Sequence, residues 1–327
     1  ADQITAISVG SDQHLVNYDF CEVPPASLSG VVHVDLNSNC ELDTGEETLA
    51  GVTIQLLDEQ GEVVDSTQTG TDGRYVFEDL RPGVYAVREM QPSGYFHGGQ
   101  RPGAAGGDIR VADLIATIPL TGGQHLSGYD FCELPPATLS GYVFQDGPTI
   151  VTADGQTPEN LWDIRDGQRT PDDTPIAGVV MQLRDGLTGQ TLDASMALPG
   201  VYASGPIQAV TDANGFYEFT GIPGGQLYAV YQVHPDGYID SIDTVGTTTG
   251  TAVNAAQPVD ELLLSQLVAS PKEDAIIRIY VAAGESSELN NFSEVRVKPQ
   301  LPPPPPIIPP TPTPLVLPPA VMPPVLF

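Results

Sequence analysis

The sequence predicts an all-β protein made of tandem antiparallel β-sandwiches, and three observations support this fold class. First, 34 glycines and 32 prolines among 327 residues are typical of many short strands joined by tight turns. Second, period-two alternation or β-branched enrichment occurs at residues 52–57, 75–77, 85–89 and 276–281. Third, the chain repeats itself at the size of one small domain. Several short strands in each repeat favour an immunoglobulin-like sandwich.

An internal repeat sets the predicted domain boundaries. Residues 1–30 and 112–141 are identical at 18 of 30 positions when they are aligned at an offset of 111. A second shared block, GVTIQLLD in one copy and GVVMQLRD in the other, lies between the copies of the first. The sequence therefore divides into the closing strands of a preceding repeat, or a donated strand, at 1–25, a first unit at 26–136, a second unit at 137–298 with an insertion at 149–172, and a Pro-rich tail at 299–327.

Acidic residues dominate the charged side chains. The chain has 12 Lys and Arg against 42 Asp and Glu, a formal net charge of −30. This charge repels phosphate backbones and anionic membrane surfaces, so it argues against nucleic acid as a partner and favours multivalent cations. Membrane insertion is not expected, because no run of 18 uncharged apolar residues is free of proline. Since the sequence begins at Ala1 without Met or a signal peptide, we expect a processed or trimmed product.

The segment after the first predicted strand has the spacing of a calcium-binding loop. If Asp35 is position 1 of DLNSNCELDTGE, side-chain oxygens fall at positions 1, 3, 5, 9 and 12, and position 7 offers a backbone carbonyl. Cys40 replaces the usual turn glycine at position 6. An acidic turn in an acidic protein is the simpler alternative, but five matched positions favour Ca²⁺. The predicted ligands are Asp35, Asn37, Asn39, Glu41, Asp43 and Glu46.

The second unit contains a partial copy of this loop. Alignment on the shared Ala-Gly pair after the loop matches Asp146 with Asp35, Asp166 with Asn39, and Asp173 with Glu46. Two other ligand positions hold Ile164 and Thr170, which lack oxygens of the needed kind, so the insertion would have to supply Asp163 or Asn160. We therefore expect a second, less complete metal site built on Asp146, Asp166 and Asp173.

These motifs resemble a known family. The pattern D-x-N-x-N, followed by GVTIQL, TDGRYVF, LRPGVYAV and QPSGY, resembles the B repeats of serine–aspartate-repeat surface proteins, which are collagen-adhesin B-type domains. The resemblance covers most of residues 1–298 and implies a prealbumin-like sandwich, bound calcium and a stalk or spacer role at the cell surface. Many such domains carry a Lys–Asn isopeptide bond. The only lysines here are Lys272 and Lys298, late in the second unit, so that bond is not expected.

The cysteines predict a disulfide in the first unit. Cys40 follows the first strand and Cys132 ends the last strand, and in a seven-strand sandwich these two strands run the same way, which brings both cysteines to one pole. The aligned positions of the second unit hold Gly167 and Ser293, so both cysteines are absent together. This paired absence favours a Cys40–Cys132 disulfide and an oxidising, extracellular setting over two buried free thiols.

Cys21 is the repeat equivalent of Cys132, so residues 1–25 copy the end of a unit whose beginning is not in this chain. We expect Cys21 to pair with a loop cysteine of that upstream repeat. The same residues should form strands only against a sandwich that receives them, either upstream in a longer chain or in a neighbouring subunit.

The tail at 299–327 contains 14 prolines in 29 residues, no charged residue and no glycine. Proline at this density dictates an extended polyproline II path. Because spacers are usually solvated by polar side chains and this tail has few, we expect it to lie in an apolar groove of another copy of the chain. Copies would then join head to tail.

Taken together, these features predict a structural, calcium-binding segment of an extracellular fibre, stalk or surface layer at the cell surface. The alternative is a cell-surface adhesin that binds a glycan or protein ligand through the second-unit insertion, which contains the only tryptophan, Trp162. An enzyme is not expected, because no Ser/His/Asp set, phosphate loop or Cys/His zinc pattern appears. His33, His97 and His234 stand isolated in the sequence.

Overall fold

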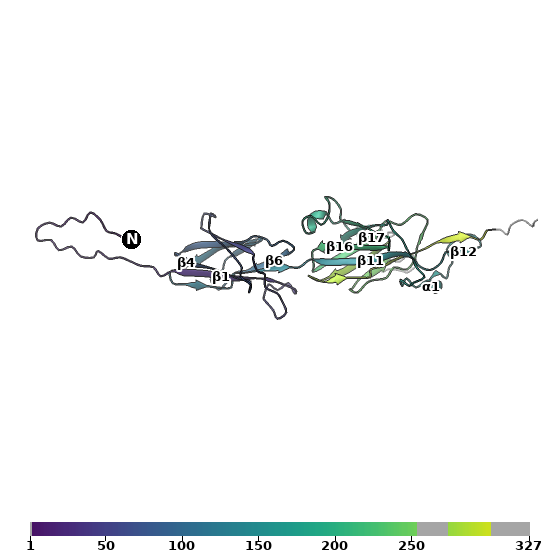
Figure 1. Ribbon diagram of the computed structural model, residues 1–327, viewed down its shortest axis with the longest axis horizontal. Helices are drawn as coiled ribbons and strands as arrows, with labels where there is room; N and C mark the ends of the chain where they lie inside the picture. The colour runs from purple at the N-terminus through teal and green to yellow at the C-terminus, as the bar shows by residue number, and fades with distance from the viewer. Residues whose placement is uncertain (1, 254–273, 302–327) are drawn as a thin grey trace, which may run out of the picture.

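The computed structural model describes residues 2–253 and 274–301, and these residues form an all-β architecture with two sandwiches. Figure 1 shows the sandwiches one after the other along the long axis of the molecule. The predicted fold class of tandem antiparallel sandwiches is therefore confirmed. The predicted tail lies outside the described residues beyond Leu301.

The first sandwich consists of two five-stranded sheets. One has the order β4-β1-β10-β6 with β9 also paired to β1, and the other has the order β3-β2-β5-β8-β7. The strands are β1 (Ala26–Val34), β2 (Thr53–Leu57), β3 (Val63–Gln68), β4 (Arg74–Leu80), β5 (Gly83–Glu89), β6 (Phe96–Arg101), β7 (Asp108–Val111), β8 (Leu114–Leu120), β9 (His125–Leu126) and β10 (Asp130–Leu134).

The second sandwich repeats this topology. One sheet has the order β13-β11-β22-β18 with β16 and β21 also paired to β11, and the other has the order β15-β14-β17-β20-β19. The elements are β11 (Ala137–Gln145), β13 (Thr174–Pro175), β14 (Val180–Asp185), the 3₁₀ turn η1 (Ala194–Met196), β15 (Gln208–Val210), β16 (Phe216–Ile222), β17 (Gln226–Gln232), β18 (Ile239–Asp240), β19 (Thr251–Val253), β20 (Ala275–Val281), β21 (Ser286–Ser287) and β22 (Phe292–Val295).

The insertion of the second unit forms its own small substructure. It contains β12 (Ile150–Thr152) and the short helix α1 (Leu161–Ile164). Strand β12 pairs in parallel with β23 (Val297–Pro299), which follows the last strand of the sandwich. The chain therefore leaves the second unit beside the insertion (Figure 1).

Each core lies between the two sheets and follows from the alternation of the strands. In β4, Tyr75 and Phe77 are buried whereas Val76 between them is exposed. The same alternation buries Tyr217 and Phe219 of β16 in the second unit. The two cores are separate clusters of buried side chains, which identifies the units as independent packing domains.

The first and last strands of each unit are parallel neighbours. Val32 of β1 lies opposite Phe131 of β10, and Val143 of β11 lies opposite Phe292 of β22. Both strands of each pair therefore end at the same pole, where the acidic loops begin. Residues 2–25 contain no strand. A single extended segment is not stable as a strand without a sheet to pair with. The pairing of residues 2–25 with a receiving sandwich stays a prediction.

Candidate metal centre

The acidic loop of the first unit begins at the buried end of β1. The main chain of Asp35 is fixed because its N–H donates to the carbonyl oxygen of Glu133 on the neighbouring β10, at 2.8 Å. The residue is fully buried. The pairing of first and last strands thus places one carboxylate at the mouth of the sandwich, and the loop is built around it.

The Asp35 carboxylate organises the loop backbone. Its Oδ1 atom accepts the N–H groups of Asn37 at 3.1 Å and Ser38 at 2.7 Å, and its Oδ2 atom accepts the N–H of Cys40 at 2.7 Å. Oδ1 also accepts the N–H of Asn39 at 3.3 Å, so the lone pair left for a further partner is on Oδ2. A carboxylate with this many backbone donors holds a tight turn.

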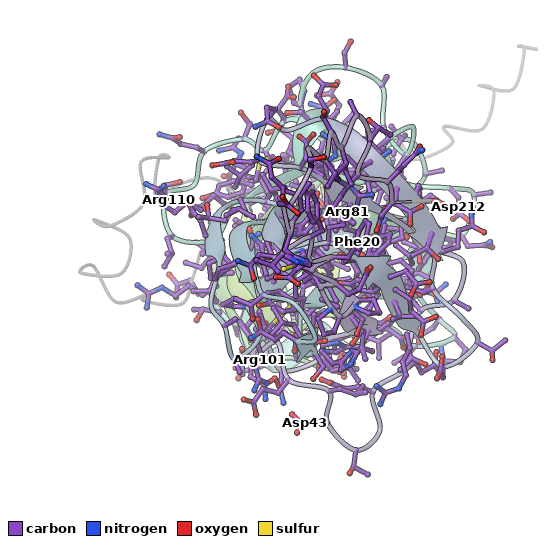
Figure 2. The ribbon with its side chains drawn as sticks, turned by 90° about the vertical axis from the view of Figure 1, so that its left-hand side faces the viewer. Phe20, Asp43, Arg81, Arg101, Arg110 and Asp212 are labelled. Carbon is purple, nitrogen blue, oxygen red and sulfur yellow. A yellow bond between two sulfur atoms is a disulfide. The ribbon has the colours of Figure 1, made fainter. Side chains whose placement is uncertain are left out.

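The remaining predicted ligands converge on the same turn. Asp43 Oδ2 accepts the side-chain amides of Asn37 and Asn39, both at 2.8 Å. These hydrogen bonds, that of Asn39 first and then that of Asn37, lower the pKa of Asp43 below its ordinary value. Glu46 closes the loop, because its two oxygens accept the N–H groups of Leu36 and Asp43, each at 2.9 Å. Figure 2 shows Asp43 at the margin of the molecule.

Glu41 differs from the other predicted ligands. Its carboxylate pairs with Arg101 of β6, with 3.2 Å between Oε1 and Nη1, and its N–H donates to Asn39 Oδ1 at 2.7 Å. Its side chain is thus engaged with the neighbouring strand. Such an arrangement leaves the backbone carbonyl as the group that Glu41 would offer to an ion, the role predicted from its position in the loop.

The predicted Cys40–Cys132 disulfide is confirmed. It joins the loop to β10 across 92 residues of sequence, with 5.4 Å between the two Cα atoms. Cys21 is free and exposed within the described part of the chain. The disulfide ties the acidic loop to the last strand at the same pole where Asp35 is hydrogen-bonded to Glu133.

Cys40 adopts the backbone conformation that favours glycine. Its φ is +54°, in the left-handed region. The substitution of the usual loop glycine therefore leaves the turn intact. The disulfide and the hydrogen bond from the Cys40 N–H to Asp35 hold a conformation that costs a non-glycine residue of order 1–3 kcal/mol.

The loop of the second unit has the same frame around Asp146. The Asp146 N–H donates to the carbonyl oxygen of Glu294 at 2.8 Å, and Asp146 Oδ2 accepts the N–H of Gly167 at 2.9 Å. Asp173 closes this loop, since its Oδ1 accepts the N–H of Gly147 at 2.7 Å and its Oδ2 accepts the N–H of Thr170 at 2.6 Å. The predicted alignment of the two loops is reproduced in their hydrogen bonds.

The insertion contributes further acidic groups to this loop. A recess is lined by the carboxylate residues Asp146, Asp163, Asp166, Asp172 and Asp173 and by Arg165. Burial, and more weakly the charges of Asp173 and Asp166, raise the pKa of Asp146. Of the two residues that could complete the ligand set, Asp163 lines this recess. Asn160 precedes α1 and is not among the lining residues.

The residues of the first loop fit a hard divalent cation. Three carboxylates and two amide side chains gather within twelve residues, and oxygen atoms of this kind are the ligands that Ca²⁺ prefers. The second loop has more carboxylates and no amide pair at its centre, so its fit is less specific.

A second set of titratable groups escaped the sequence analysis. His97 and His234, isolated along the chain, lie beside carboxylates: His97 Nδ1 is 2.6 Å from Oδ1 of the partly exposed Asp113, and His234 Nδ1 is 3.4 Å from Oε1 of the fully buried Glu294. The available signal was the repeat itself, because Asp113 matches Asp274 and Glu133 matches Glu294 in the aligned units.

The first sandwich and its acidic loop match one family of known repeats. Residues 26–121 match the family model of the SdrD B-like domain. The resemblance to B repeats of serine–aspartate-repeat surface proteins is thereby confirmed for the first unit.

Two relatives of known name are similar to most of the chain. The chain is 29% identical over 247 residues to serine–aspartate repeat-containing protein D of Staphylococcus aureus strain Newman, a match that covers 75% of the chain and 16% of that protein. It is 24% identical over 257 residues to serine–aspartate repeat-containing protein F of Staphylococcus epidermidis, covering 75% and 13%. The match thus spans 16% of the length of the first relative and 13% of the second. The predicted extracellular, cell-surface location is confirmed by this sequence similarity.

Two solved structures are also similar at low identity. The minor pilin GBS52 of Streptococcus agalactiae matches with a TM-score of 0.33 and 13% identity over 85% of the chain and 99% of that structure. A mutant of the shaft pilin spaA from Lactobacillus rhamnosus GG matches with a TM-score of 0.31 and 10% identity over 86% and 100%. Among the described residues, no helix is long and apolar enough to cross a membrane.

Proposed function

We propose that the chain is a structural segment of an extracellular fibre or stalk, in which calcium fixes the acidic loops and thereby stiffens the joints between units. We assign it no catalytic role. The observation that carries this proposal is a backbone contact at the joint between the two units that recurs, between equivalent residues, where the chain enters the first unit.

The joint between the two sandwiches is short and rigid. Strand β10 ends at Leu134 and β11 begins at Ala137, so only Pro135 and Pro136 separate the units. Each proline has a fixed φ, which removes much of the freedom of a linker. The carbonyl oxygen of Pro135 also accepts the N–H of Gly284, in a turn of the second unit, at 3.2 Å.

The same joint recurs at the start of the first unit. The carbonyl oxygen of Pro24, the repeat equivalent of Pro135, accepts the N–H of Gly123 at 2.9 Å. Val23 packs closely there, since a Cβ on Gly122 would stand 2.4 Å from its Cγ1 atom. A connection built twice from equivalent residues supports a rod of repeating units, because each unit would meet its neighbour in the same orientation.

The acidic loop of the first unit lies at this joint. Leu36, the second residue of the loop, has its Cδ2 atom 3.7 Å from the place where a Cβ on Gly284 would stand. An ion bound by Asp35, Asn37, Asn39, Asp43 and Glu46, with the carbonyl of Glu41, would hold the loop in one conformation. The contact with the following unit would then resist bending, and part of the self-repulsion of a chain with charge −30 would be offset.

The two ends of the chain supply the means of assembly in this proposal. Residues 2–25 carry exposed apolar side chains, among them Ile7, Val16 and Phe20, and would complete a preceding unit in the same chain or in another copy. At the other end, β23 pairs with β12 and Leu301 is 84% exposed. The tail would continue from there into an apolar groove of the next copy.

Scattering and electron microscopy of the full chain test the proposal. With saturating calcium we expect a narrow distribution of rod lengths, and with a chelator a broader and shorter one. Asp35→Ala should resemble the chelated protein. Asp58→Ala is the matched control, because Asp58 also accepts backbone N–H groups in a turn but lies outside the loop. Equal rod shapes with and without calcium in the wild type would refute the stiffening role.

The assembly part is tested by a separate variant. Truncation after Lys298 should leave both sandwiches folded and abolish filaments or higher oligomers of the full chain. Assemblies of normal length from the truncated protein would show that the tail does not join subunits.

A further inference from the structure

A cluster of His, Asp and Glu joins the two sheets of the first sandwich. His97 lies on β6 directly opposite Glu133 of β10, and Asp113 lies at the turn before β8 in the other sheet. His97 Nδ1 is 2.6 Å from Asp113 Oδ1, and one ligand atom from each of the three side chains lies within 4.8 Å of the others. The cluster therefore brings one nitrogen and two carboxylate oxygens from both sheets to one point.

Buried carboxyl groups without N–H or hydroxyl donors point to a missing cation. Glu133 is fully buried and its Oε1 atom receives no N–H or hydroxyl donor, while Oε2 accepts the Gln91 amide. Glu89, at the end of β5, is 2% exposed, and its carboxyl group is hydrogen-bonded to that of Glu133, so two acidic groups are buried side by side. Since buried carboxylates are normally paired or coordinate metals, these groups require a positive charge or a proton.

The second sandwich contains the same set of groups. His234 Nδ1 lies 3.4 Å from Glu294 Oε1 and 3.8 Å from Asp274 Oδ2. Glu294 is fully buried, and its Oε2 atom has no hydrogen-bond partner. Asp240 and Asp243 also approach Asp274 to within 4.8 Å.

The two clusters differ in where the histidine comes from. In the aligned repeats His234 stands at the position of Gln91, and Asp240 stands at the position of His97. The carboxylates keep their places on the last strand and before β8 or β20. Each unit thus has one imidazole in the cluster, although the two histidines occupy different aligned positions. This pattern is expected if the cluster needs one imidazole and does not need it at a particular position.

We propose that each sandwich binds one divalent cation of the zinc class at its His–Asp–Glu cluster, through His97, Asp113 and Glu133 in the first unit and through His234, Asp274 and Glu294 in the second. A mixed nitrogen and oxygen donor set suits Zn²⁺, whereas Ca²⁺ takes oxygen ligands. In the first unit the ion takes the place of the proton between His97 and Asp113. The side chains of these two residues are 32% and 24% exposed, which leaves access for the ion and a water ligand.

The bound ion acts as a clamp between the sheets. His97 and Glu133 belong to the sheet of β1, whereas Asp113 joins the sheet of β5 and β8, where its carbonyl oxygen accepts the Glu89 N–H at 2.9 Å. The sites are distinct from the acidic loops, so their loss leaves calcium binding unchanged.

Zinc binding to the untagged full chain in excess calcium tests the proposal. In the proposed function calcium fills the oxygen-rich loops, and with those loops saturated we expect two further equivalents of Zn²⁺ per chain by competition with a chromophoric chelator. His97→Gln and His234→Gln should each lower the Zn²⁺ affinity of one site. The loss should be at least the roughly 10–100-fold that results from removing a hydrogen-bond partner of a metal ligand. His125→Gln is the matched control, because His125 contacts Ser27 on the surface. Asp35→Ala should leave the zinc stoichiometry unchanged.

A spectroscopic measurement on the wild type guards against variants that fail to fold. Co²⁺ bound by one imidazole and two carboxylates gives visible d–d absorption, which should appear with two equivalents and disappear on addition of Zn²⁺. Absence of zinc binding in the wild type, or equal binding by the control and both histidine variants when all are folded, would overturn the proposal.

Discussion

The two sandwiches differ at the same pole of the fold, where the first has a disulfide and the second does not. In the first unit Cys40 is bonded to Cys132, and Gly99 of β6 lies against both sulfurs, since a Cβ there would stand 3.3 Å from Cys132 Sγ and 3.7 Å from Cys40 Sγ. The aligned positions of the second unit hold Gly167, Ser293 and Ile242. The bulk of the disulfide in one unit is replaced by the isoleucine side chain in the other.

The loop backbone has the same conformation at this position with and without the disulfide. Cys40 has φ +54° and Gly167 has φ +66°, and each donates its N–H to the Oδ2 atom of the buried aspartate that begins its loop. The second unit ties its pole together without a covalent bond, because Ser293 Oγ donates to the Ile242 carbonyl at 2.8 Å. The disulfide adds stability to a turn that the aspartate already shapes.

The largest expected difference between the units follows from the disulfide. Cross-linking a loop of about 90 residues stabilises a fold by about 4–5 kcal/mol in the chain-entropy treatment. Cys132→Ser should therefore lower the free energy of unfolding of the first unit by that amount and leave the second unchanged. Calorimetry with and without reductant measures it, with Cys21→Ser as the control. A shift of both transitions would show that the units do not unfold separately.

Calcium should stabilise the first unit more than the second. For a site of roughly micromolar affinity, millimolar calcium adds on the order of 4 kcal/mol. Thermal melting should show a higher melting temperature of the first unit with calcium than with chelator. Glu46→Ala should remove this difference. Asp173→Ala should change only the smaller shift of the second unit. An unchanged melting temperature for the wild type would eliminate the calcium site of the first unit.

Gly167 should be the least replaceable residue of the second loop. A Cβ there would stand 2.3 Å from the carbonyl oxygen of Ile242, and its φ is positive. We expect Gly167→Ala to destabilise the second unit by about 2–3 kcal/mol, because both the contact and the backbone conformation oppose a side chain. Denaturant unfolding measures the effect. Gly178→Ala is the control, since it shares the positive φ but has open space around it.

Measured per pH unit, the smallest effect is the pH dependence of stability in the presence of a chelator. Burial, and then the charge of Glu133, raise the pKa of Glu89 from 4.5 to about 10, so the folded protein retains a proton that the unfolded chain releases. The stability associated with this proton is fully present below pH 4.5 and is lost as the pH rises toward 10. One such group contributes at most about 1.4 kcal/mol per pH unit.

The second unit has Gln232 at the position of Glu89. Glu89→Gln should therefore flatten the fall in stability of the first unit between pH 5 and 8, and make its slope resemble that of the second. In the first unit the residual slope comes from Glu133, whose pKa burial raises, and from His97, whose pKa the hydrogen bond to Asp113 raises. In the second unit it comes from Glu294 and Asp243, whose pKa values burial raises, and from His234, whose pKa the hydrogen bond to Asp274 raises. An identical slope in Glu89→Gln and wild type would mean that Glu89 does not hold the proton.

Much of the fold was predictable because its signals are local or repeated. The alternation in residues 75–77 and 85–89 reappears in β4 and β5, and the paired absence of two cysteines pointed to the disulfide. The predicted ligands from Asp35 to Glu46 lie within twelve residues, so their convergence needs only one turn of the chain. Their role as calcium ligands stays a prediction.

The sequence alone determined the fold class, the repeat, the disulfide and the acidic loops, because each depends on spacing along the chain or on comparison of two copies. The tertiary structure decided which distant residues meet. His97, Asp113 and Glu133 come from three segments of two sheets, and their contact depends on strand register and on the stacking of the sheets. The contact of Leu36 with the turn at Gly284 likewise depends on how the units are joined. Periodicity places a side chain on a face of a strand, but only the packed sandwich sets what lies opposite it.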